Sequence, residues 1–150
     1  MKIAIGSDEQ MHMTDYVVEE VKKRGHEVEV FGPLAHHQEY WPAVAQQVAE
    51  RVAAGDSDEG ILFCWTGTGV SMAANKVPGV RAALCDDAET ARGARLWNNA
   101  NVLCLSIRRV SEVLAHEIID AWFSTEYKPN RDDDNCLAQL AEIESIYTIL

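Results

Sequence analysis

The chain has 150 residues, 47% of them hydrophobic, which is enough for one globular domain with a sizeable core. Its 24 acidic residues against 13 Lys and Arg give a formal net charge of −11, which argues against nucleic acid or an anionic membrane as partner. Because no apolar run approaches the roughly 18 residues of a membrane span and the opening residues are too short for a signal sequence, we expect a cytoplasmic protein.

Short apolar runs alternate with longer segments of helical period, a pattern typical of a parallel sheet flanked by helices. The strands are predicted over residues 2–6, 27–31, 60–64, 80–84 and 101–105. The helices are predicted over residues 11–24, 42–54, 68–76, 86–97, 110–123 and 132–150. No linker, repeat or low-complexity tract divides the chain, so we predict a single domain over 1–150.

This succession of elements predicts a Rossmann-like three-layer α/β sandwich. We expect five parallel strands in the order 2-1-3-4-5, with helices on both faces and an extra helix at the C-terminus. In that order the topological switch of the sheet lies between strands 1 and 3. Ligands of open α/β sheets bind in the crevice beyond the carboxyl ends of the strands at such a switch. The prediction therefore directs attention to two segments, 6–9 and 64–69.

The segment after the third strand carries the richest chemistry. Gly67 and Gly69 allow the backbone N–H groups to turn toward a ligand, and a helix beginning near Thr68 adds a positive dipole end. We expect an anion there, either a phosphate or an oxyanion formed during a reaction. Cys64 lies at the strand end facing this site, where its thiolate is favoured and it can serve as a base. The alternative for Cys64 is a core cysteine.

Asp8 follows the first strand and faces the same crevice, although a carboxylate in this position can also be a simple cap. A dinucleotide fingerprint is excluded because Met72 stands where its third glycine belongs, and a Walker loop is excluded because Gly69 precedes Val70 and Ser71. The four cysteines form no CxxC pair and the histidines are scattered, so we expect neither a metal nor a cofactor.

One run of residues resembles a known family. Residues 60–76, GILFCWTGTGVSMAANK, followed by PGVRA at 78–82, are similar to the ribose-5-phosphate isomerase B and galactose-6-phosphate isomerase family. The similarity extends to IAIGSD at 3–8, to Arg95 with Asn98 and NVL at 101–103, to Arg108, and to IDAW at 119–122 with Arg131. It therefore covers nearly the whole chain.

The resemblance implies an aldose–ketose isomerase that needs no metal and forms a homodimer, with its site at the dimer interface. It implies that Cys64 removes the proton beside the carbonyl and that the backbone of the segment Gly67, Thr68, Gly69, Val70 and Ser71 holds the enediolate oxygen. Thr66 would hydrogen-bond the substrate, and Asp8 and Asn98 would bind its hydroxyls. Arg108 and Arg131 would hold a phosphate, Arg131 across the dimer.

Four positions depart from the family pattern. Glu9 stands where a phosphate-binding His is usual, Trp97 replaces a His that assists ring opening, Asn135 replaces a second phosphate-binding Arg, and Trp41 lies in the segment that usually contains Asp-Tyr-Pro. Tryptophans 41, 65 and 97 would thus lie on or near substrate-facing loops, with helix packing as the alternative for Trp41 and Trp97.

These departures lead to three hypotheses. The first is an isomerase with an atypical substrate: a short sugar phosphate, a modified sugar or an unphosphorylated sugar. The second is a family member that has lost catalysis and binds a sugar or nucleotide-like ligand. The third, a redox sensor at Cys64, has little support because no resolving cysteine is near in sequence. The apolar stripe of Leu137, Leu140, Ile143 and Ile146 predicts a homodimer, with a tetramer as the alternative.

Overall fold

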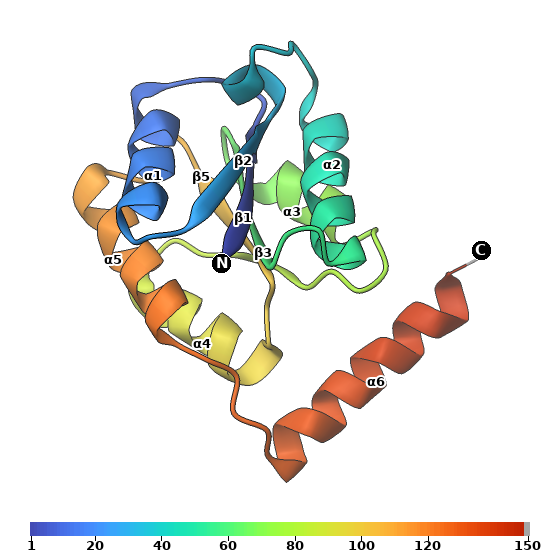
Figure 1. Ribbon diagram of the computed structural model, residues 1–150. Helices are drawn as coiled ribbons and strands as arrows, with labels where there is room; N and C mark the ends of the chain where they lie inside the picture. The colour runs from blue at the N-terminus through green and yellow to red at the C-terminus, as the bar shows by residue number, and fades with distance from the viewer. Residues whose placement is uncertain (149–150) are drawn as a thin grey trace.

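A computed structural model describes residues 1–148 as a five-stranded parallel sheet with helices on both faces (Figure 1). The strands are β1 (Lys2–Ser7), β2 (Glu27–Phe31), β3 (Glu59–Cys64), β4 (Ala82–Leu84) and β5 (Val102–Ser106). The helices are α1 (His12–Lys23), α2 (Trp41–Ala54), α3 (Thr68–Ala74), α4 (Ala88–Asn98), α5 (Glu112–Ser124) and α6 (Arg131–Tyr147), and a short 3-10 helix, η1 (Gly32–Ala35), follows β2. Every predicted strand and helix is present with boundaries shifted by a few residues, whereas η1 was not predicted; the last two residues of the predicted C-terminal helix lie outside the described residues.

Two separate apolar layers hold the sheet between the helices, which confirms the three-layer sandwich. Ile3, Ile5 and Phe63 point to the face covered by α1, α4 and α5, while Ala4 and Leu62 point to the face covered by α2 and α3. Successive residues of a strand point to opposite faces, so strands that are apolar at every position must be buried on both. This is why β1, β3 and β5 occupy the middle of the sheet.

The predicted strand order is wrong at one edge, because the observed order is β2-β1-β3-β5-β4. β4 has only three residues, and all of them are partly or largely exposed, whereas all five residues of β5 are buried. A short strand with exposed residues suits the edge, while a strand that is apolar on both faces gains most from an interior position. The swap places the carboxyl end of β5 directly beside that of β3.

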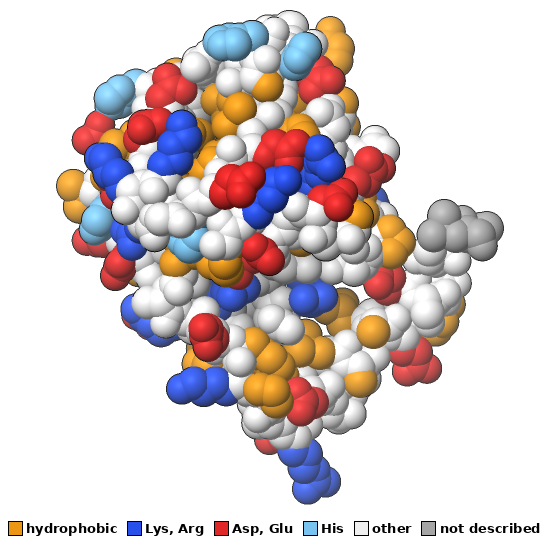
Figure 2. Space-filling view, viewed as in Figure 1, with side chains coloured by type: hydrophobic (Ala, Val, Ile, Leu, Met, Phe, Trp, Pro, Cys, Tyr) orange, Lys and Arg blue, Asp and Glu red, His pale blue; other side chains and the backbone are white. Residues whose placement is uncertain are grey.

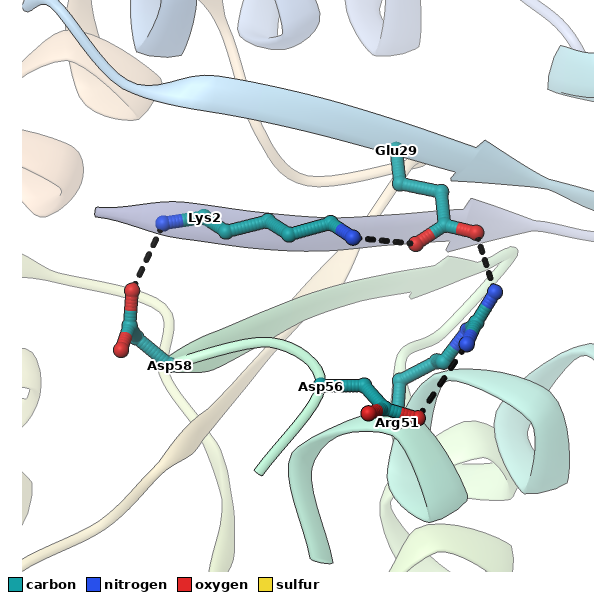
Figure 3. A network of polar contacts seen from close by, with 5 residues as sticks. All are labelled: Lys2, Glu29, Arg51, Asp56 and Asp58. Atoms are coloured by element: carbon teal, nitrogen blue, oxygen red, sulfur yellow. Dashed lines mark hydrogen bonds and ion pairs between the residues drawn. The ribbon is translucent and has the colours of Figure 1, made fainter. Parts of the chain in front are cut away.

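A network of charged side chains ties the sheet to α2 at the amino ends of the strands, opposite the predicted crevice (Figure 3). Glu29 on β2 pairs with Lys2 on β1 at 3.5 Å and with Arg51 on α2 at 2.6 Å. Arg51 also pairs with Asp56 at 3.2 Å, and the backbone N–H of Lys2 donates to Asp58 at 2.7 Å. These side chains are partly exposed, so the network sets the alignment of the strands and contributes little stability.

A second charged group at this end is buried and joins β3 to α4 and α5. Glu59 is 6% exposed; one of its oxygens accepts from Trp122 Nε1 at 2.7 Å, and the other pairs with Arg95 at 2.7 Å. Arg95 also donates to the carbonyls of Ala100 and Thr125 and lies over the Trp122 ring. The C-terminal ends of α4 and α5 are therefore fixed at the amino end of the sheet.

Helix α6 lies outside the two helix layers that cover the sheet (Figure 1) and buries none of its residues. Its first turn carries Asp132, Asp133 and Asp134, as predicted for a helix start, and Asn130 caps it by accepting from the Asp133 N–H. Near its other end, Glu144 accepts from the Gly79 N–H at 2.9 Å. No helix within residues 1–148 is long and apolar enough to cross a membrane.

Candidate functional site

Cys64 is the last residue of β3 and lies at the carboxyl edge of the sheet, between the two strands that flank β3. It is 6% exposed and belongs to the apolar layer beneath α2 and α3. In the sheet register Ser7 is opposite Phe63, so Asp8 comes next to Cys64 on one side, and Ser106 is opposite Cys64 on the other. Neighbouring strands are about 4.8 Å apart. The structure thus brings Asp8 and Cys64 together, as the predicted switch between strands 1 and 3 requires.

Hydrogen bonds from the end of β5 fix the turn that follows Cys64. The Ile107 N–H donates to the Cys64 carbonyl at 3.1 Å, while the Ser106 hydroxyl and the Arg108 N–H both donate to the Trp65 carbonyl, at 2.9 and 3.1 Å. The backbone of Arg108 therefore lies next to the turn after Cys64, and its side chain is exposed. In the predicted strand order β4 would have stood between them, so this proximity follows from the corrected order.

The two glycines of the turn make room for different neighbours, while the expectation that they turn backbone N–H groups toward a ligand stays a prediction. Gly67 has a φ of 75° and precedes α3, and a Cβ there would stand 2.5 Å from Leu84 Cδ1 and 3.0 Å from the Leu105 carbonyl. Gly69 lies within α3 and has no positive φ. A Cβ at Gly69 would stand 3.1 Å from ring atoms of Trp41, so this glycine makes room for an indole.

The remaining members of this segment differ in accessibility. Thr66 is exposed, and its hydroxyl lies 2.7 Å from that of Thr68, so both are open to a ligand. Val70, in the first turn of α3, has a fully buried side chain, which leaves only its backbone for a ligand. Ser71 is half-buried one turn into the helix. The accessible groups of the segment are thus two hydroxyls and the backbone before α3.

The other buried cysteines are core residues. Burial raises the pKa of Cys85 to about 12 and raises that of Cys104 further, so both remain thiols at neutral pH. Cys104 is opposite Leu62 in the register, which makes it a diagonal neighbour of Cys64, with Cα atoms about 8 Å apart by strand geometry. A disulfide spans no more than about 7 Å between Cα atoms, so this arrangement does not favour the redox hypothesis.

A cavity of about 540 Å³ lies beside Asp8 and Glu9, between the end of β1 and the turn after β2. Its remaining lining residues are Gln10, Pro33, His36 and Gln38. Asp8 Oδ1 is shielded from water and has no hydrogen-bond partner among the described residues. Burial, and to a smaller extent the charge of Glu9, raises the pKa of Asp8 above its usual value. The cavity thus presents carboxyl and amide groups to a ligand.

Four predicted site residues lie at the opposite edge of the sheet from Cys64 of the same chain, and the expectation that Trp97 is on or near a substrate-facing loop stays a prediction. Trp97 and Asn98 end α4, just past Arg95, which is bonded to Glu59 at the amino end of β3. A helix that follows a parallel strand runs back along it, so its last residues reach the other edge of the sheet. Arg131 and Asn135 lie in the first turns of α6 and are exposed.

The surroundings of Trp97 resemble those of Trp41. Trp97 is 58% exposed and its ring lies over Gly93 on the same helix, where a Cβ would stand 2.7 Å from the ring. Both tryptophans thus rest on a glycine, but Trp41 does so at the crevice and Trp97 at the far end. Trp65, which follows Cys64, is 52% exposed.

Sequence reasoning missed Ser106 and the residues of η1 and its flanks that line the cavity. The position of Ser106 depends on which strand neighbours β3, and no pattern in the sequence reports this. His36 adopts a left-handed conformation, with a φ of 63°, and a histidine in the sequence does not by itself predict this conformation. The segment 32–38 could have been suspected, because it follows a strand and must also lie at the carboxyl edge.

The fold and the site define an α/β protein in which a thiol and a carboxyl group follow two adjacent strands at a strand switch, with a cavity beside the carboxyl group. The sequence model of the family described as Ribose/Galactose Isomerase matches residues 3–139. The chain belongs to this family, and it is an isomerase.

Similar proteins include galactose-6-phosphate isomerase subunit LacB of Clostridium acetobutylicum, 35% identical over 95% of this chain and 83% of that protein. D-erythrulose-4-phosphate isomerase of Pectobacterium atrosepticum is 37% identical over 85% of this chain and 86% of that protein. The solved structure of ribose-5-phosphate isomerase B from Clostridium thermocellum superposes with a TM-score of 0.91 at 41% identity, covering 99% of this chain and 100% of that one. The fold and family expected from the resemblance are thus confirmed.

Proposed function

We propose that the chain interconverts an aldose and a ketose through Cys64 as base and an enediolate intermediate. The observation that carries the proposal is the position of Cys64, at the carboxyl end of β3 beside Asp8 and directly before the 67–71 segment. The Cys64 thiolate takes the proton from the carbon next to the carbonyl, and the C–H electrons form the enediolate while the carbonyl oxygen gains the charge. The hydroxyl proton of the deprotonated carbon passes to the former carbonyl oxygen, and the proton on sulfur goes to the former carbonyl carbon, so that the C=O group now stands on the neighbouring carbon.

The other residues of the crevice would stabilise this intermediate. The Ser71 N–H donates to the Gly67 carbonyl, so the backbone N–H groups of residues 67–70, at the start of α3, would face the developing oxyanion, where a preorganised donor lowers the barrier most. The Thr66 hydroxyl donates to a substrate oxygen, and Asp8, which lines the cavity, accepts from substrate hydroxyls. Arg108, which begins beside the Trp65 carbonyl, supplies charge for a phosphate.

The proposed substrate is a short, open-chain sugar phosphate. Trp97 stands where the family usually has the ring-opening His, and an open-chain substrate needs no such group. The relative named for D-erythrulose 4-phosphate supports this choice: in a four-carbon sugar whose terminal hydroxyl is phosphorylated, no hydroxyl is left to close a five-membered ring. Ribose 5-phosphate still has a free hydroxyl that closes a five-membered ring, so without a ring-opening group we expect it to be a poor substrate. Phosphorylated sugars are retained in the cytoplasm, which is where we place the protein.

We also propose a homodimer whose site lies between the two copies. Arg131, Asn98 and Cys64 cannot meet within one chain, since they lie at opposite edges of the sheet, but residues of a second copy can complete the crevice. Helix α6 supplies a surface for this association: Leu140, Ile143 and Ile146 are between 48% and 64% exposed. Figure 2 shows a hollow between α6 and the rest of the chain with hydrophobic side chains beside it.

The second candidate function is binding of a sugar without turnover, and the replacements at Glu9, Trp97 and Asn135 favour it. Incubation in deuterated water with a panel of aldoses, ketoses and their phosphates separates the two, because isomerisation incorporates deuterium beside the carbonyl. We expect exchange with the wild type, none with Cys64→Ala, and ligand affinity within a few fold in that variant. Cys104→Ala is the matched control and should keep the exchange. Equal exchange by wild type and Cys64→Ala would contradict the assignment of the base.

A further inference from the structure

Trp41 is seated on the segment that follows Cys64. A Cβ at Gly69 would stand 3.1 Å from Cδ2 and Cε3 of the indole and 3.3 Å from Cε2, closer than ordinary van der Waals contact. The indole can therefore occupy this place only because residue 69 has no side chain. Its neighbour Tyr40 is 86% exposed, whereas Trp41 is 38% exposed.

The indole also lies at the crevice rather than elsewhere on the α2–α3 layer. One turn further along α2, Val44 packs on the end of β1, where a Cβ at Gly6 would stand 2.6 Å from Val44 Cγ1. Gly6 comes two residues before Asp8, and Gly69 comes five residues after Cys64. The start of α2 therefore lies against the carboxyl end of β1 and the first turn of α3, which puts Trp41 at the carboxyl edge of the sheet, on the segment that follows Cys64.

The ring has little freedom to move aside. Beneath it is the backbone of α3, and Pro42, the next residue, restricts the first turn of α2. Aromatic side chains have only two rotatable bonds and cover a large area, so a tryptophan held in this way is a rigid wall. A longer substrate would have to displace it.

We infer that Trp41, seated on Gly69, is a specificity-determining residue that limits the length of the sugar accepted by the crevice. The inference rests on the proposed function, because it concerns the substrate of the same site. In a closed pocket one additional carbon group is discriminated by roughly 10- to 200-fold. A six-carbon sugar phosphate exceeds a four-carbon one by two such groups, so the indole alone can account for a strong preference for short substrates.

The test compares wild type with Trp41→Ala, and uses Tyr40→Ala as a matched control that removes the adjacent aromatic ring. The probes are D-erythrulose 4-phosphate, ribose 5-phosphate and galactose 6-phosphate, with kcat/KM measured for each. We expect the ratio of galactose 6-phosphate to D-erythrulose 4-phosphate to rise at least about tenfold in Trp41→Ala and to stay unchanged in Tyr40→Ala. A ratio that changes less than about twofold in a folded Trp41→Ala variant overturns the inference.

A second variant and a binding measurement keep the outcome decisive. Trp41→Phe keeps an aromatic ring on Gly69 but shortens it, so it should give an intermediate ratio even if Trp41→Ala fails to fold. If wild type turns over none of the probes, the proposed function fails, and the ratio of the Kd values for the same probes then decides on Trp41. Turnover with a ratio independent of residue 41 would reject the role of Trp41 and leave the isomerase proposal in place.

Discussion

Replacing Arg95 by Met tests whether the buried group at the amino end of the sheet holds α4 and α5 in place. Arg95 pairs with Glu59 at 2.7 Å, and the two side chains are 14% and 8% exposed. Removing the cation leaves a buried carboxylate whose only described partner is Trp122, and removal of one partner of such a pair costs about 3–5 kcal/mol. We expect this loss in the free energy of unfolding at pH 8.

The cost should depend on pH with a definite sign. Burial raises the pKa of Glu59 above its usual value, and Arg95 is the strongest influence in the opposite direction. The stability that a group with a raised folded-state pKa contributes is fully present below its unfolded-state pKa, here about 4.5, and is lost as the pH rises through the folded-state value. In Arg95→Met that value rises further, so Glu59 takes up a proton at a higher pH and the penalty shrinks on acidification.

Urea unfolding of both proteins at pH 8 and pH 5, followed by circular dichroism, measures the effect. Arg92→Met is the matched control, because Arg92 lies on the same helix and, within residues 1–148, pairs only with Glu89 of that helix. We expect a clearly smaller difference from wild type at pH 5 than at pH 8 for Arg95→Met, and little change for Arg92→Met at either pH. A loss below about 1 kcal/mol, or one that is equal at both pH values, would refute the reasoning.

Three further predictions concern phosphate affinity, assembly and the surface network. Glu9→His combined with Asn135→Arg should lower the Kd for sugar phosphates by about two to four orders of magnitude, because each of the two charge-assisted hydrogen bonds contributes roughly 1.5–3 kcal/mol. Efficient turnover of ribose 5-phosphate by the unmodified protein would contradict the proposed substrate. Sedimentation at micromolar concentration should give about twice 16.7 kDa for wild type and a smaller mass for Ile143→Asp, and a fully active monomer would contradict a shared site. Arg51→Met should leave Tm within experimental scatter, since water screens its ion pairs, and a large drop measured by calorimetry would show that the network in Figure 3 is more than an alignment device.

The local chemistry of the chain sufficed to predict most of the fold. The alternation of apolar runs with helical periods indicated the parallel sheet, and the Glu and Val alternation of residues 27–31 matches an edge strand, where β2 is found. The switch rule predicted that β1 and β3 lie side by side, which the register confirms, and a shared crevice for Asp8 and Cys64 remains a prediction. These predictions hold because periodicity, turn residues and the direction of parallel strands are local or topological properties that a sequence carries directly.

Only tertiary packing decided which of β4 and β5 lies beside β3. It also decided which side chains come together at each edge of the sheet. Whether β4 or β5 stands beside β3 depends on which strand gains more from burial on both faces, and this competition determines that Ser106 and Arg108 adjoin Cys64. The seat of Trp41 on Gly69 likewise depends on how closely α2 approaches α3. Trp97 shows the limit most clearly: α4 carries it to the far edge of its own sheet, because a helix between parallel strands runs the length of the sheet, so its role in a crevice depends on how two chains assemble.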